Sequence, residues 1–134
     1  MLVKSRMRLR AQRVLLVEDA PEIRDAFSLL LRAEGAEVTA AATGREALER
    51  AAHAPFDVLL TDLGLPDIPG DVLIRQILTT ATGRPRVVVV TGYSEPYISR
   101  ARAAGADAVF TKPIEWSVLM QQLLPDPQKP VAAA

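Results

Sequence analysis

Short apolar runs alternate with segments of helical periodicity along most of this 134-residue sequence. Three of the runs, 13–17 (RVLLV), 57–61 (DVLLT) and 86–91 (RVVVVT), are apolar except at their ends. An apolar run without alternation predicts a strand that is buried on both faces, which is typical of parallel sheets covered by helices on both sides. The pattern therefore favours an α/β fold.

The segments between these runs carry apolar residues at the spacing of helices. Pro21 suits the first turn of one helix, and Gly35 suits its end. Weaker strands are predicted at 36–41 and 107–110, and further helices at about 44–53, 72–78, 96–104 and 116–123. Because each helix returns the chain to the start of another parallel strand, we expect one open, doubly wound five-stranded sheet, (βα)5.

Composition narrows the class of protein. Cysteine is absent, which excludes disulfides and thiolate metal sites, and no apolar run approaches the roughly 20 residues needed to cross a bilayer. Five cations precede the first acid, Glu18. A basic arm can contact nucleic acid or anionic lipid, but a solvated terminus is the simpler interpretation. We therefore predict a basic arm or linker over 1–12, one domain over 13–124 and a flexible tail over 125–134.

Polar side chains follow four of the five predicted strands. Glu18 and Asp19 follow the first strand, Asp62 follows the third, Thr91 ends the fourth and Lys112 follows the fifth. Each has an ordinary alternative role: a helix cap for Asp19, a turn cap for Asp62, a strand end for Thr91 and an exposed surface lysine. The carboxyl ends of parallel strands share one edge, where ligands bind in such sheets, so the convergence favours a functional site.

Three carboxylates at one edge repel one another unless positive charge compensates them. Lys112 supplies one charge, and a hard divalent cation such as Mg²⁺ could supply two. This set of groups predicts a phosphoryl site in which Asp62 is the nucleophile and forms an aspartyl-phosphate. Asp19, helped by Glu18, would hold Mg²⁺, while Thr91 and Lys112 would bind phosphoryl oxygens.

Four segments, LLVEDAPEIR, DVLLTDLGLPDIPG, VVVVTGY and GADAVFTKPI, occur in this order. With them the chain resembles the receiver domain of two-component response regulators over about 13–124. The resemblance implies the flavodoxin-like strand order 2-1-3-4-5 and a phosphoacceptor at Asp62. It also implies Mg²⁺ (or Mn²⁺) bound by the metal ligands Glu18, Asp19, Asp62 and the backbone carbonyl of Gly64, with Thr91 and Lys112 completing the site. Pro66 and Gly70 match the family's loop, and the peptide bond before Pro113 is often cis in the family.

Two positions depart from the commonest family pattern. Val109 occupies the position of the usual switch aromatic, and Phe110 cannot replace that aromatic because adjacent strand residues face opposite sides. Tyr93 lies two residues after Thr91, and we expect its ring to shield the acyl phosphate partly from water, whereas Gly64 shields nothing. The Ala-rich helix at 96–104 is expected either to be weakly anchored and able to move or simply to be short.

The sequence therefore predicts a cytoplasmic phosphoacceptor in a two-component phosphorelay, a signalling protein that catalyses only its own phosphorylation and dephosphorylation. Its expected partners are a histidine kinase or phosphotransfer protein and a downstream protein target, with no direct nucleic acid binding and no membrane insertion. We expect a monomer or a weak dimer, either a stand-alone regulator or the receiver of a hybrid sensor histidine kinase. Alternatives are a non-phosphorylated binding module and an aspartyl phosphohydrolase, which usually carries a second acid where Gly64 stands. His53 is predicted to be exposed at a helix end, and Trp116 to pack without a binding role.

Overall fold

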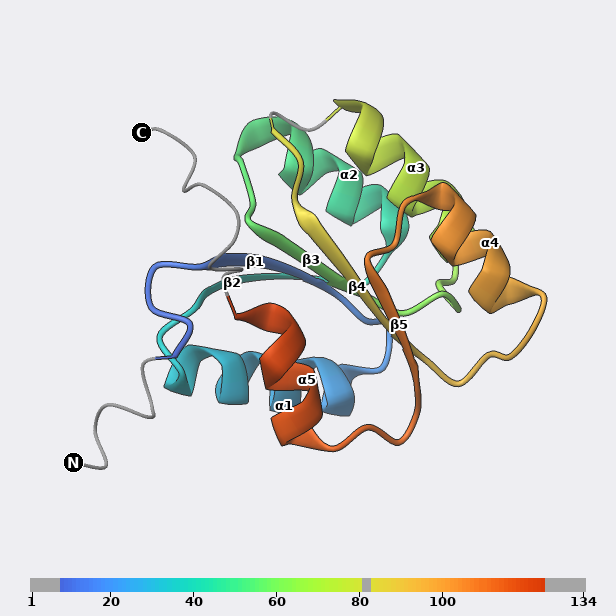
Figure 1. Ribbon diagram of the computed structural model, residues 1–134. Coiled ribbons are helices and arrows are strands. Elements are labelled where there is room, and N and C mark those ends of the chain that lie inside the picture. The colour runs from blue at the N-terminus through green and yellow to red at the C-terminus, as the bar shows by residue number, and fades with distance from the viewer. Residues whose placement is uncertain (1–7, 81–82, 125–134) are drawn as a thin grey trace.

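The computed structural model describes residues 8–80 and 83–124, which form a parallel five-stranded sheet with helices on both faces (Figure 1). The strands are β1 (Arg13–Val17), β2 (Glu37–Ala41), β3 (Val58–Thr61), β4 (Arg86–Thr91) and β5 (Ala108–Thr111). The helices are α1 (Pro21–Ala33), α2 (Gly44–His53), α3 (Gly70–Thr80), α4 (Tyr97–Ala104) and α5 (Trp116–Leu123). The strand order is β2-β1-β3-β4-β5, so the predicted doubly wound, flavodoxin-like topology is confirmed.

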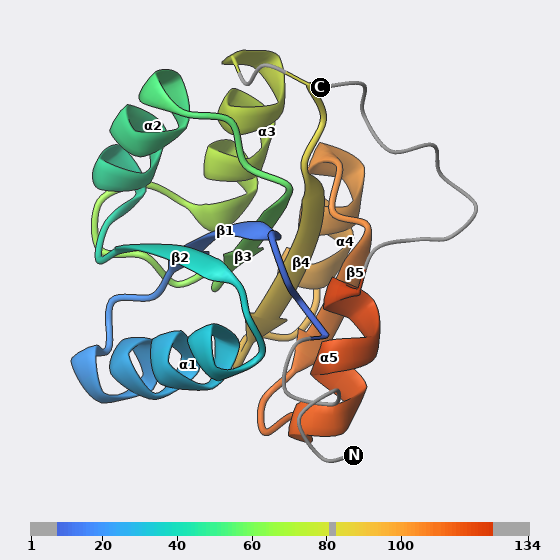
Figure 2. The same ribbon diagram turned by 90° about the vertical axis from the view of Figure 1, so that its left-hand side faces the viewer.

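The sheet separates two apolar cores. Helices α1 and α5 cover one face, and α2, α3 and α4 cover the other, as the two perpendicular views show (Figures 1 and 2). Along β1, Val14 and Leu16 belong to the cluster under α1 and α5, whereas Leu15 and Val17 belong to the opposite cluster. Alternate side chains of one strand thus enter different cores. This is why the central strands are apolar at every interior position.

The strand and helix boundaries differ slightly from the predicted ones. Strands β2 and β3 begin one residue later than predicted, β5 is shifted by one residue, and α4 begins at Tyr97 instead of residue 96. Asp57 and Asp107 were expected inside strands, but each stands just before one and accepts a main-chain N–H from a neighbouring strand. Asp57 Oδ2 accepts from Arg13 N at 2.8 Å, and Asp107 Oδ2 accepts from Val87 N at 2.7 Å.

Residues 8–12, the described part of the predicted basic arm or linker, are in contact with the domain. The Leu9 side chain is completely buried in the cluster under α1 and α5. Leu9 N donates to Glu34 O at 2.8 Å, and the Arg8 guanidinium binds the Glu34 carboxylate with Nη2 to Oε2 at 2.9 Å. Residues that contribute to the core of the domain therefore begin before residue 13. Lys4, Arg6 and the predicted tail at 125–134 lie outside the described residues.

Helix α4 packs against the sheet through small side chains. Its buried residues are the alanines Ala101 and Ala104, whereas Tyr97 and Arg100 are exposed. Two alanines bury less apolar area than Leu73, Ile74 and Ile77 of the neighbouring α3, which supports the expectation that α4 is weakly anchored. In the described part of the chain, no helix is both long and apolar enough to cross a bilayer.

Candidate functional site

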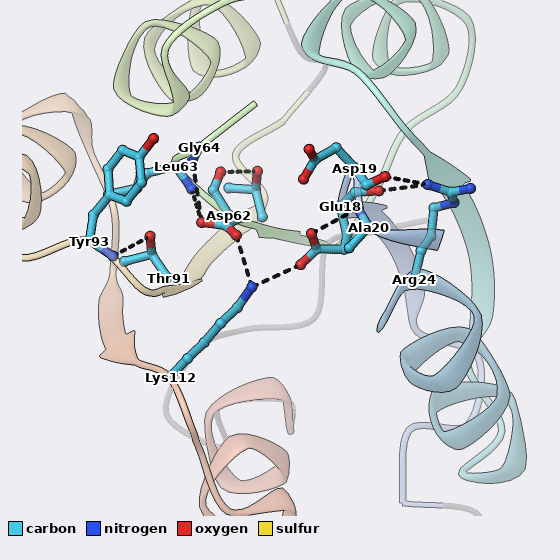
Figure 3. A network of polar contacts seen from close by, with 11 residues as sticks. Glu18, Asp19, Ala20, Arg24, Asp62, Leu63, Gly64, Thr91, Tyr93 and Lys112 are labelled. Atoms are coloured by element: carbon cyan, nitrogen blue, oxygen red, sulfur yellow. Dashed lines mark hydrogen bonds and ion pairs between the residues drawn. The ribbon is translucent and has the colours of Figure 1, made fainter. Parts of the chain in front are cut away.

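A network of charged side chains lies at the carboxyl edge of the sheet, where β1, β3 and β5 end (Figure 3). Lys112 Nζ donates to Asp62 Oδ2 at 2.9 Å and to Glu18 Oε1 at 3.2 Å. The Glu18 and Asp62 side chains are only 5% and 12% exposed. The structure thus brings together three residues that are at least 44 positions apart in sequence, around one ammonium group.

Asp62 is fixed by its own backbone as well as by Lys112. Its N–H donates to Val17 O at 3.2 Å, which continues the pairing of β3 with β1. Its Oδ1 accepts from Leu63 N at 2.6 Å and from Gly64 N at 3.3 Å. Asp62 therefore does cap the turn that follows it, as the alternative predicted, and its other carboxylate oxygen binds Lys112.

The protonation of the Asp62–Lys112 pair follows from its surroundings. Burial by itself raises the pKa of the Asp62 carboxyl. Hydrogen bonds from Lys112, Thr91 and the Gly64 N–H outweigh burial and hold that pKa below its usual value. Burial likewise lowers the pKa of Lys112, but its bonds to Asp62 and Glu18 raise that pKa overall. At neutral pH the site thus holds an ionised carboxylate beside an ammonium.

Glu18 and Asp19 follow β1 in different environments. Glu18 is buried, and its Oε2 accepts from Ala20 N at 3.2 Å. Asp19 is exposed beside it, and its carboxylate accepts no hydrogen bond from any residue that the structure describes. The N-cap of α1 is Ala20, without a side-chain cap, so the alternative that Asp19 caps α1 is wrong.

Arg24 supports this acidic pair and was missed by the sequence reasoning. Its Nη1 donates to the backbone carbonyl of Glu18 at 2.9 Å and to that of Asp19 at 3.4 Å. The signal in the sequence was an arginine in the second turn of α1. That end of a helix does not favour a cation, but nothing in the sequence indicates that backbone carbonyls are its partners.

Thr91 connects the site to the loop after β4. The side chain is fully buried, and Thr91 O accepts from Lys112 N at 2.8 Å. Thr91 Oγ1 accepts from Tyr93 N at 3.1 Å. Its hydroxyl also contributes to the lowered pKa of Asp62. Thr91 therefore lies between the phosphoacceptor candidate and Tyr93.

The Tyr93 ring lies over the backbone of Gly64. A Cβ atom at residue 64 would stand 2.9 Å from the Tyr93 hydroxyl and 3.1 Å from Cζ, closer than ordinary contact allows. The Tyr93 ring also meets Tyr97 edge-on, with centroids 5.0 Å apart, and the Arg100 guanidinium lies 5.5 Å from the Tyr97 ring. A side chain at position 64 would therefore have to displace the exposed Tyr93 ring, a contact that the sequence did not reveal.

The remaining predicted positions behave as follows. Val109 packs with the core under α2, α3 and α4, and Phe110 packs with the opposite core, so the two face opposite sides as predicted. The Lys112–Pro113 peptide bond is cis. His53 is exposed at the end of α2, as predicted, and the predicted packing of Trp116 is confirmed by the centroid of its ring 6.1 Å from that of Phe27.

The oxygen donors at this edge suit a hard cation in their chemistry. Carboxylates and a backbone carbonyl are the ligands that Mg²⁺ and Mn²⁺ accept. Within residues 8–80 and 83–124, however, no three acidic or histidine side chains stand close enough to form a ready metal cage. Lys112 holds one oxygen each of Glu18 and Asp62, so the Asp19 carboxylate is the donor with both oxygens available.

The chain matches a known protein family over most of its length. The family model for the response regulator receiver domain matches residues 14–124. Transcriptional regulatory protein KdpE of Mycobacterium tuberculosis is 37% identical over 124 residues, which cover 90% of this chain and 53% of KdpE. Response regulator protein PilR of Pseudomonas aeruginosa is 35% identical over 105 residues, covering 78% of this chain and 23% of PilR. The chain thus spans about half or less of the length of these curated relatives.

Solved structures share the same architecture. A CheY-like response regulator receiver domain protein from Methanospirillum hungatei superposes with a TM-score of 0.80 at 33% identity, covering 84% of this chain and 90% of that one. The receiver domain of sensor histidine kinase PA1611 from Pseudomonas aeruginosa, solved with a magnesium ion in its active site cleft, gives a TM-score of 0.77 at 29% identity. That match covers 84% of this chain and 94% of the other.

Proposed function

The chain belongs to the response regulator receiver domain family, and we propose that it accepts a phosphoryl group on Asp62 and signals through a protein partner. The observation that supports this most directly is the ionised, largely buried Asp62 carboxylate, which stands 2.9 Å from Lys112 at the ligand-binding edge of the sheet. An isolated surface aspartate would have neither the burial nor the fixed cation.

The proposed donor is the phosphohistidine of a histidine kinase or phosphotransfer protein. An oxygen of Asp62 attacks phosphorus, the phosphorus–nitrogen bond of the donor breaks, and the imidazole leaves with its electron pair and takes up a proton. Such transfers depend on positioning and on neutralising the charge of the phosphoryl oxygens. Lys112 binds one of those oxygens, and the Thr91 hydroxyl donates to another.

Magnesium or manganese is the proposed cofactor. Glu18, Asp19, Asp62 and the backbone carbonyl of Gly64 would hold the ion. When bound, the ion supplies positive charge to the phosphoryl oxygens. The PA1611 receiver, which is described with magnesium in its active site cleft, supports this assignment by similarity. Within this chain, Arg24 holds the carbonyls of Glu18 and Asp19 and so fixes the segment that presents both carboxylates.

Signalling is proposed to follow from the new charge at the sheet edge. A phosphoryl group adds about −1.5 to −2 charge, which shifts the population of α4 and β5 toward a state that a downstream protein binds. We propose a cytoplasmic protein without direct contact to nucleic acid and without the turnover of an enzyme. The chain is either a stand-alone regulator or the receiver of a hybrid kinase.

Phosphorylation by acetyl phosphate tests the proposal. The protein is incubated with acetyl phosphate and Mg²⁺, and its intact mass is measured beside that of Asp62→Asn. We expect a gain of one phosphoryl group in the wild type and none in the variant. No gain in the wild type would favour a non-phosphorylated binding module, and repeated release of phosphate from unrelated esters would favour a phosphohydrolase.

A further inference from the structure

The loop that follows Asp62 is attached to the beginning of α2 through the side chain of Asp67. Asp67 Oδ1 accepts from Gly44 N at 2.9 Å, and Oδ2 accepts from Arg45 N at 2.8 Å. Oδ1 also accepts from Ile68 N at 3.0 Å. Gly44 and Arg45 open α2, so two N–H groups that lack partners within that helix are satisfied by a carboxylate from another segment.

Steric contact reinforces this attachment. A Cβ atom at Gly44 would overlap the side chain of Ile68, whose Cδ1 would lie 2.6 Å away, and would stand 3.3 Å from Asp67 Oδ1. A larger residue at position 44 would therefore have to displace the Ile68 side chain from α2. The carboxylate and the isoleucine thus fix the same point of the loop, one by hydrogen bonds and the other by packing.

The other end of the loop is fixed at Gly70. Gly70 N donates to Leu63 O at 3.1 Å, and a Cβ atom at residue 70 would stand 2.9 Å from the backbone oxygen of Asp62. The Leu63 and Gly64 N–H groups, which donate to Asp62 Oδ1, belong to the same loop and precede Asp67 in the chain. The geometry around Asp62 therefore depends on where this loop is held.

Asp67 is an exposed residue, yet its surroundings favour its charged form. Burial acts to raise the pKa of its carboxyl, but main-chain hydrogen bonds from Arg45, Gly44 and Ile68 hold that pKa below its usual value. The N-terminus of α2 also carries the positive end of the helix dipole. At neutral pH the hydrogen bonds from the first N–H groups of α2 to Asp67 are therefore charge-assisted.

We propose that Asp67 is a positioning residue for phosphorylation, which acts by tying the loop that carries Leu63 and Gly64 to the N-terminus of α2. This inference rests on the proposed phosphoacceptor function. A purely structural alternative is that Asp67 serves only α2, as an additional cap. The two roles differ in whether loss of the contact changes the chemistry at Asp62.

The chain offers a matched control in Thr43, whose side chain caps the same helix without a hydrogen bond to the described residues of the loop. Glu46 N donates to Thr43 Oγ1 at 3.0 Å, so Thr43→Ala removes one cap bond of α2 and leaves Asp67 in place. Asp67→Ala removes cap bonds of α2 that are also the hydrogen bonds between the loop and that helix. Comparing the two variants separates helix capping from loop positioning.

The experiment compares wild type, Asp67→Ala, Asp67→Asn and Thr43→Ala. Intact mass follows the rate of phosphorylation by acetyl phosphate at saturating Mg²⁺, chemical denaturation gives each stability, and hydrogen exchange follows the Leu63 and Gly64 amides. We expect Thr43→Ala to keep a rate close to that of wild type. Asp67→Ala should lose at least about tenfold, because displacement of reacting groups by about 1 Å can slow a reaction on the order of a hundredfold. Its loop amides should also exchange faster.

The conservative variant should fall between these limits. Asp67→Asn retains one acceptor oxygen, so it should recover part of the rate and part of the amide protection. Equal phosphorylation rates in Asp67→Ala and Thr43→Ala, with unchanged exchange of the loop amides, would overturn the positioning role of Asp67. The proposed function would still stand in that case, because it depends only on phosphorylation of the wild-type protein. An unmodified wild-type protein would overturn the proposed function and this inference with it.

Discussion

The Tyr93 hydroxyl lies so close to Gly64 that a Cβ atom at residue 64 would approach it to 2.9 Å. Tyr93 therefore covers the loop beside the phosphoacceptor candidate, while its own N–H is bound to Thr91 Oγ1 at 3.1 Å. This bond fixes the Tyr93 backbone, and the ring itself makes an edge-on contact with Tyr97. Its position is consistent with a role in limiting the access of water to Asp62.

Replacing Tyr93 by alanine should shorten the lifetime of the phosphorylated state several-fold. Removing the ring exposes the loop at Gly64 and with it the route of water to the acyl phosphate. The protein is phosphorylated with acetyl phosphate, the reagent is removed, and loss of the phosphoryl group is followed by intact mass. Tyr93→Phe, which keeps the ring, should retain the wild-type lifetime. An unchanged lifetime in Tyr93→Ala would refute the shielding role.

Replacing Lys112 by alanine should slow phosphorylation of Asp62 by about a hundredfold, as the loss of one charge-stabilising donor does in enzymes. The substitution leaves Glu18 and Asp62 without the cation that binds both, so the pKa of Asp62 should rise. Phosphorylation by acetyl phosphate gives the rate, and a carboxyl carbon NMR titration gives the pKa.

Lys112→Arg separates the effect of the positive charge from the effect of the shape of the donor. It keeps a positive charge but replaces a compact ammonium with a planar fork, so it should restore the low pKa of Asp62 more fully than the rate. If Lys112→Ala were phosphorylated within about twofold of wild type, Lys112 would have no part in binding the phosphoryl group.

Leu9→Ala should destabilise the domain by about 2 to 5 kcal/mol, the range for a buried leucine that leaves a cavity. Leu9 is fully buried under α1 and α5 although it precedes the predicted domain boundary. Urea denaturation monitored by Trp116 fluorescence measures the change. Arg10→Ala, at an exposed position in the same segment, is the control and should be close to neutral. An unchanged free energy of unfolding in Leu9→Ala would indicate that this segment is an arm that does not stabilise the domain.

The sequence predicted the strand-end residues well because their placement depends on topology alone. Once β1, β3, β4 and β5 are parallel neighbours, the residues that follow them must share one edge of the sheet. Arg24 and Asp67 were missed because their partners are backbone groups. Asp67 binds N–H groups 22 and 23 positions away, and no side-chain pattern marks a backbone donor.

Leu9 was missed for a different reason. A single apolar residue among arginines carries no periodicity, so the pattern at 8–12 could not distinguish a buried anchor from a solvated arm. What places Leu9 against the domain is a long-range contact, the hydrogen bond from Leu9 N to Glu34 O at 2.8 Å.

Stability at acidic pH should depend measurably on Asp107. Burial raises the pKa of its carboxyl, but hydrogen bonds from the Val87 N–H and from Arg84 outweigh burial and hold that pKa below the ordinary value of 3.8. Near and below pH 3.8 the unfolded chain therefore binds more protons at this residue than the folded chain does. The stabilisation from Asp107 is complete well above that pH and is lost as the pH falls through the folded-state pKa.

Asp107→Asn should therefore make the loss of stability below about pH 5 less steep than in the wild type, because the remaining acids still titrate but this one does not. The amide oxygen can still accept from Val87 N, so the variant should fold. Free energies of unfolding are compared from about pH 2.5 to pH 7 by urea denaturation. Asp25→Asn is the control, since Asp25 is exposed and accepts no hydrogen bond from the described residues. Parallel curves for Asp107→Asn and wild type would contradict a lowered pKa at Asp107.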